Sequence, residues 1–63
     1  MIKVIIKFRQ STHHEPPVTF YADSGGTLYA DGKFIYWNEA ETNDCISYNT
    51  NAILEIREQD VNP

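Results

Sequence analysis

The dipeptide Asp31-Gly32 separates two short apolar runs, 27–30 and 33–37, and it is the strongest local signal in the sequence. An Asp-Gly pair readily supplies the two positive φ angles of a type I′ turn, whose twist matches that of the flanking strands. The pair therefore predicts a tight β-hairpin. A two-residue loop at this point places Tyr29 opposite Phe34 on the neighbouring strand.

Apolar residues alternate with a period of two in several other segments, which is the mark of a half-buried strand. The pattern is clearest over residues 2–9. A polar connection at 10–17 follows, and its two final prolines forbid a helix and favour an extended exit. The remaining predicted strands span residues 18–22, 45–48 and 52–58.

The last of these segments carries two signals. Ala, Leu, Glu and Arg within 52–58 are good helix formers, and Asn51 is a candidate N-cap. However, the apolar and charged residues of the segment alternate with a period of two, which favours a strand. We therefore predict a strand, followed by a frayed polar tail at 59–63.

Residues 23–26 include two glycines and are expected to form a second tight turn. Pairing through both turns predicts a three-stranded meander of 18–22, 27–30 and 33–37. Both faces of this meander are apolar, whereas a solvated sheet has polar residues on one face. Either the sheet curls into a small barrel, or a second surface covers it.

We predict an all-β fold with a single domain over residues 1–58. Five to six short antiparallel strands form a small barrel or a curled meander. Along the chain, a first strand is followed by a longer loop, then by a meander, and then by a one-turn break before the last strand. This order resembles the topology of small SH3-like or Sm-like barrels, and the resemblance implies that fold alone.

The 63-residue length indicates one domain of marginal stability, and the single cysteine excludes an intrachain disulfide. No run of 18 apolar residues occurs, so no membrane span is expected. The apolar run at 4–6 is bounded by lysines and lacks a following cleavage site, unlike a signal peptide. Together with the lone thiol, this predicts a cytoplasmic protein.

The chain has a net charge of −4, and the charge is unevenly distributed. Three of its five Lys and Arg residues lie before residue 10, whereas eight of its nine Asp and Glu residues lie after residue 22. Proteins that bind duplex nucleic acid draw most of their affinity from cations that neutralise phosphates. Nucleic-acid binding is therefore disfavoured.

Residues that carry chemistry are few. The cluster His13-His14-Glu15 lacks the further ligands that a zinc site needs, and adjacent histidines on an extended loop point in different directions. Cys45 is expected to be a small buried hydrophobe. A domain this small also leaves little room for a ligand pocket of several hundred Å³. We predict no enzymatic activity, no catalytic residues, no metal site and no cofactor.

The aromatic residues are the better functional lead. Four Tyr, three Phe and one Trp are too many for the inner face of so small a sheet. Tyr and Trp are enriched at binding hot spots, although rim tyrosines with the hydroxyl in water are the ordinary alternative. We predict a non-catalytic protein-interaction module, a small inhibitor or accessory subunit, that binds a protein partner through surface aromatics within an acidic rim. The predicted binding residues are Tyr21, Tyr36, Trp37, Glu39 and Glu41.

The alternative is a small barrel that binds single-stranded nucleic acid by stacking bases on exposed aromatics along a basic groove. The available cations for such a groove are Lys3, Lys7, Arg9 and Lys33.

Self-association is a further expectation. A chain this small, with no disulfide or metal to stabilise it, gains from burying more surface in a homodimer. The first strand, 2–9, is a candidate edge for this contact.

Overall fold

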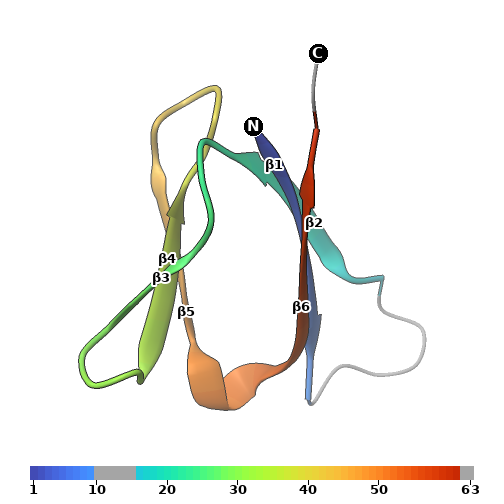
Figure 1. Cartoon of the computed structure of the whole chain (residues 1–63). Coiled ribbons are helices and arrows are strands. Elements are labelled where there is room, and N and C mark those ends of the chain that lie inside the picture. Colours follow the sequence, from blue (N-terminus) through green and yellow to red (C-terminus); the bar gives the residue numbers. More distant parts are fainter. Residues whose placement is uncertain (10–15, 62–63) are drawn as a thin grey trace.

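The computed structural model describes residues 1–9 and 16–61. The described chain is all-β, apart from one short 3₁₀ turn. Its elements are β1 (Ile2–Phe8), β2 (Val18–Ala22), β3 (Thr27–Tyr29), β4 (Phe34–Asn38), β5 (Cys45–Asn49), η1 (Thr50–Ala52) and β6 (Ile53–Asp60). They form two three-stranded antiparallel sheets, β2-β1-β6 and β3-β4-β5, which face each other (Figure 1).

The predicted hairpin at Asp31-Gly32 is confirmed. Tyr29 pairs with Phe34, and the Lys33 N–H donates to the Ala30 carbonyl at 3.1 Å. Asp31 has a φ of 58° and Gly32 a φ of 82°, so both central residues have the positive φ of a type I′ turn. The turn sets the register of β3 against β4.

The predicted meander is wrong, because β2 pairs with β1 and not with β3. Phe20 lies opposite Val4 in this pairing. Residues 23–26 form no hairpin but carry the chain from one sheet to the other (Figure 1). Pairing with β1 places β2 over the core, where Ala22 is completely buried.

The crossing segment passes close to the core side chain Trp37. A Cβ atom on Gly26 would lie 2.8 Å from Trp37 Cε2 and from Ile35 Cδ1. Glycine is therefore required by a close approach of the backbone to the indole, not by a tight turn.

The first strand is central and not an edge, since β1 lies between β2 and β6. The predicted strand at 52–58 is confirmed, with its start at Ile53. β6 also includes Gln59 and Asp60, and the Val61 N–H donates to the Met1 carbonyl at 3.0 Å. The prediction of fraying from Gln59 onwards is therefore wrong for these residues, because the long β1 provides them with a pairing partner.

The core lies between the two sheets. Its most deeply buried large side chains are Val4 and Ile6 from β1 and Trp37 from β4. The Phe20 ring packs edge-on against the Trp37 indole, with ring centroids 5.4 Å apart. The full set of buried hydrophobic residues is Val4, Ile6, Ala22, Ile35, Trp37 and Ile53.

The two sheets approach each other at one corner through an isolated bridge between Ala22 and Glu39. The described residues form two separate sheets and not a closed barrel. In residues 1–9 and 16–61, no helix has the length and apolar character needed to cross a membrane.

Candidate functional site

The five predicted binding residues do not lie together. Trp37 is only 1% exposed, because it points inward from β4 between the sheets. Its assignment as an exposed anchor is therefore corrected: the indole belongs to the core. Tyr36, the next residue back along β4, lies on the opposite face of its sheet and is half-buried.

The other three predicted residues line one surface groove of about 390 Å³. Tyr21 contributes an aromatic side chain that is 44% exposed, and Glu39 and Glu41 contribute carboxylates. The remaining lining residues are Met1, Thr19 and Phe20. We call this feature the acidic groove.

Backbone hydrogen bonds hold the two sides of the acidic groove together. The Ala40 N–H donates to the Tyr21 carbonyl at 3.0 Å, and the Asp23 N–H donates to the Asn38 carbonyl at 3.0 Å. The end of β2 is thereby joined to the end of β4. Tyr21 consequently lies next to the loop that carries both glutamates.

That loop, residues 39–44, is closed by its own hydrogen bonds. The Glu39 N–H donates to the Asp44 carbonyl at 2.8 Å, and the Asn43 N–H donates to the Glu39 carbonyl at 3.0 Å. Asn43 has a φ of 65°, a conformation that Asn tolerates better than most residues. The carboxylates are therefore presented on an ordered loop.

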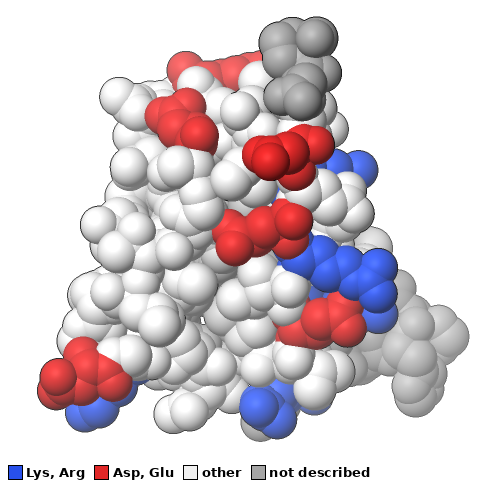
Figure 2. Space-filling view, in the orientation of Figure 1, with Lys and Arg blue, Asp and Glu red and all other residues white. Residues whose placement is uncertain are grey.

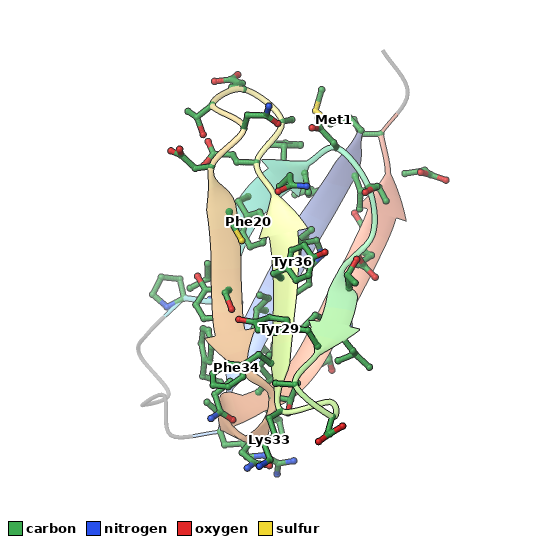
Figure 3. All side chains as sticks on the ribbon, turned by 90° about the vertical axis from the view of Figure 1, so that its left-hand side faces the viewer. Met1, Phe20, Tyr29, Lys33, Phe34 and Tyr36 are labelled. Carbon is green, nitrogen blue, oxygen red and sulfur yellow. The ribbon has the colours of Figure 1, made fainter. Side chains whose placement is uncertain are left out.

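Acidic residues dominate this end of the molecule. Asp23 and Asp44 are hydrogen-bonded through their backbones to residues 38 and 39, next to the groove glutamates. Among the described residues, no Lys or Arg lines the groove, although Lys3 lies opposite Tyr21 on the neighbouring strand β1. Acidic side chains gather in the upper part of the view in Figure 2, and Lys33 lies at the end away from Met1 in Figure 3.

A second surface, which includes the predicted binding residue Tyr36, lies on the outer face of the β3-β4-β5 sheet. Tyr29 stacks on Phe34 with ring centroids 5.5 Å apart, and it meets Tyr36 edge-on at 5.4 Å (Figure 3). The Tyr29 hydroxyl is 2.8 Å from Ser47 Oγ. The hairpin register already pairs Tyr29 with Phe34, so a signal for this cluster was present in the sequence.

Cys45 is exposed on this same sheet, and the prediction that it is buried is wrong. It begins β5, where alternation places it on the outer face opposite Asn38. With Tyr29 and Tyr36 it lines a hollow of about 140 Å³.

The expectation of little room for an enclosed ligand pocket stays a prediction, because the hollows of the described residues are open to the surface. Besides the acidic groove, an open depression of about 400 Å³ is lined by Phe8, Arg9, Asn49, Asn51 and Ala52. Both spaces are open surface hollows, and neither is an internal cavity between the two sheets.

The candidate metal-binding cluster His13-His14-Glu15 lies outside the described residues. Within the described ranges, no group of three or more His, Cys, Asp or Glu side chains is placed to hold a metal ion.

The four predicted basic residues do not all lie on one surface element. Alternation on β1 places Lys3 and Lys7 on the outer face of the β2-β1-β6 sheet, because Val4 and Ile6 point inward. Arg9 follows the end of β1, and Lys33 lies in the β3–β4 turn.

Comparisons of the chain with protein-family models, with curated proteins and with solved structures found no match.

Proposed function

We propose that the chain is a non-catalytic protein-interaction module that binds a basic segment of a partner protein in the acidic groove. The observation that carries this proposal is the groove itself, which places the exposed ring of Tyr21 beside the carboxylates of Glu39 and Glu41. A small inhibitor or an accessory subunit is the kind of protein that such a surface suits. We place it in the cytoplasm, because an exposed free thiol at Cys45 suits a reducing compartment.

Arginine is the side chain that suits the groove best. Its guanidinium group stacks on aromatic faces and pairs with carboxylates in a fixed geometry. Tyr21 offers the aromatic face, and Glu39 and Glu41 offer the carboxylates. The acidic surroundings of the groove would also accelerate the encounter with a basic partner at low ionic strength.

The finer fold proposal is an SH3-like arrangement. Three features support it: β2 leaves its sheet and continues into the other through residues 23–26, a tight hairpin joins β3 and β4, and one 3₁₀ turn separates β5 from β6.

A titration with a short Arg-Ser repeat peptide, followed by backbone NMR, tests the proposed site. We expect chemical-shift changes at Tyr21, Glu39 and Glu41, and we expect binding to weaken as salt is added. The double variant Glu39→Gln/Glu41→Gln should lose most of the affinity. The double variant Asp31→Asn/Glu55→Gln removes the same two charges outside the groove, so it is the matched control and should bind as the unaltered chain does. Shifts confined to other surfaces would overturn the proposal.

The alternative function, binding of single-stranded nucleic acid, has less support. Lys3 and Lys7 lie on the outer face of the β2-β1-β6 sheet, whereas Lys33 lies in the β3–β4 turn, and the outward positions of β3 and β4 include no cation. The same NMR titration with an oligonucleotide separates the two functions. Tighter binding than the peptide, mapped to the four predicted cations, would favour the alternative.

A further inference from the structure

The turn between β3 and β4 joins an exposed carboxylate to a glycine with open space around it. Asp31 is an exposed residue, and its carboxylate makes no hydrogen bond or ion pair with the other described residues. A Cβ atom added to Gly32 would meet nothing within 4 Å. The Gly32 backbone is therefore crowded neither by a side chain of its own nor by a neighbouring one on the side where a Cβ would lie.

We propose that Asp31 is a site of spontaneous modification, at which the folded chain converts aspartate to isoaspartate through a cyclic succinimide. This inference concerns a different part of the molecule from the acidic groove and does not depend on the proposed function.

The reaction needs only the two turn residues and water. The Gly32 nitrogen attacks Cγ of the Asp31 carboxyl group, and the N–Cγ bond forms as the proton of the nitrogen and the hydroxyl of the carboxyl group leave as one water molecule. Water then adds to the Asp31 main-chain carbonyl carbon and breaks its bond to the nitrogen, so that the chain now runs through Cγ. Addition of water at Cγ instead restores aspartate. Nothing is oxidised or reduced in either step.

The φ angle of Asp31 already suits the ring. A succinimide holds Cβ and the following nitrogen nearly eclipsed about the Cα–C bond, which in an L-residue corresponds to a ψ of about −120°. The first central residue of a type II′ turn has this ψ together with a φ of about +60°. Asp31 has a φ of 58°, an angle that a non-glycine residue of an unfolded chain adopts only rarely. The fold thus sets one of the two angles in advance, which favours an intramolecular reaction.

The other angle can change while the hairpin stays intact. Turning over the peptide group between Asp31 and Gly32 converts a type I′ turn into a type II′ turn, and both turns match the twist of the strands. Gly32 can follow this change because it has no Cβ. The Lys33 N–H donates to the Ala30 carbonyl at 3.1 Å, and this bond spans the turn in either form. Thr50 Oγ1 donates to the Gly32 carbonyl at 2.7 Å, and that carbonyl belongs to the next peptide group.

The product should fit the hairpin less well than aspartate does. Isoaspartate adds one carbon atom to the main chain of the turn, whereas the register of a hairpin depends on the length and type of its turn. The present turn pairs Tyr29 with Phe34. We therefore expect the modified chain to melt at a lower temperature than the unmodified chain.

Incubation of the full chain for several weeks at neutral pH and body temperature tests the proposal. Digestion and mass spectrometry with electron-based fragmentation then distinguish isoaspartate from aspartate, which has the same mass. The same chain unfolded in guanidinium chloride is the reference. We expect isoaspartate at residue 31 to form at least as fast in the folded chain as in the unfolded chain. Slower formation in the folded chain would overturn the proposal, because the fold would then protect the turn.

Asp23, which precedes Ser24, is an internal control in the same digest. It is also exposed and followed by a small residue, but it is not among the described residues with positive φ. The ratio of the rate at residue 31 to the rate at residue 23 should be larger in the folded chain, because the chemical difference between glycine and serine is the same in both states. An equal or smaller ratio in the folded chain would contradict the role assigned to the turn geometry.

The variant Asp31→Ser gives an independent readout, because it has no carboxyl group at the turn. The unaltered chain should lose several degrees of melting temperature as isoaspartate accumulates, whereas the variant should keep its melting temperature through the same incubation. An equal decline in both chains would show that the change arises elsewhere and would overturn the expected effect on the hairpin.

Discussion

The Glu58 carboxylate, on an exposed residue of β6, is bonded to the buried Trp37 indole: Trp37 Nε1–H donates to Glu58 Oε2 at 3.0 Å. The same oxygen accepts a hydrogen bond from the Gly26 N–H at 2.9 Å. One carboxylate on β6 thus holds both the largest core side chain and the segment that crosses between the sheets. The link joins β6 to the opposite sheet.

Glu58 is an exposed residue, but its hydrogen-bond partner Trp37 is buried, so removing this carboxylate should destabilise the fold more than removing one whose partner is exposed. Glu58→Ala leaves the buried Nε1–H of Trp37 without its partner, and an unsatisfied buried donor costs about 1–3 kcal/mol. We expect the free energy of unfolding, measured by urea denaturation, to fall by that amount. Trp37 fluorescence in the folded state should also change.

Glu55→Ala is the matched control for Glu58→Ala. Glu55 lies on the same strand, and its partner Arg57 is exposed, with a 2.8 Å contact between Nε and Oε1. Exposed ion pairs of this kind contribute about 0–1 kcal/mol. Equal losses for the two variants would show that the Glu58–Trp37 contact has no special role.

The three glycines should respond differently to substitution by alanine. At Gly26 the added Cβ would lie 2.8 Å from two core side chains, and overpacking of this kind costs about 1–3 kcal/mol. Gly32 has open space but a φ of +82°, which costs an L-residue about 1–2 kcal/mol. At Gly25 the nearest atom is Glu58 Oε2 at 3.3 Å, so the carboxylate has to shift only slightly, and the loss should be smallest.

Thermal unfolding of the three alanine variants, followed by circular dichroism, measures this order. If Gly25→Ala is the most damaging of the three, the close approach of residue 26 to the indole is wrong.

Local features of the fold were predictable, whereas the sheet assignment was not. The Asp31-Gly32 turn determines its register through neighbouring residues, and this prediction is confirmed. The pairing of β2 with β1 is non-local. The alternation of Phe20 and Ala22 with Thr19 and Tyr21 suits either partner, so periodicity alone cannot choose between them.

The site was predictable only in part. Tyr21, Glu39 and Glu41 line one groove, but their proximity depends on the β2–β4 corner at Ala22, which the predicted meander lacks. Trp37 was misassigned because alternation groups residues by face without showing which face is inside. The link between the sheets through Glu58 was missed, although alternation places this carboxylate on the same inward side of β6 as Ile56.

Because Trp37 is buried, we expect its fluorescence to be protected from quenchers dissolved in the solvent. A side chain 1% exposed should be quenched by iodide far less than free tryptophan is, and unfolding in urea should remove this protection. The protein has a single tryptophan, so the signal needs no deconvolution. If iodide quenches the folded chain as strongly as the unfolded chain, Trp37 is exposed and its assignment to the core is wrong.

Ala30 is the position where glycine should increase stability. Its φ of 54° lies in the left-handed region, which costs an L-residue about 1–2 kcal/mol. Glycine removes that cost, but it also makes the unfolded chain more flexible, which lowers the free energy of unfolding by about 0.4–1 kcal/mol. We therefore expect Ala30→Gly to raise the free energy of unfolding by about 0.8 kcal/mol, the difference between the midpoints of these two ranges.

A gain of that size would raise the melting temperature of so small a domain by a few degrees, about 4–8 °C per kcal/mol. Ala40→Gly is the control, because Ala40 lies in the 39–44 loop and is not among the described residues with positive φ. It should lower the melting temperature, since it brings the entropic penalty of glycine without relieving strain. If Ala30→Gly destabilises the protein as much as Ala40→Gly does, the left-handed conformation of Ala30 is not strained in solution.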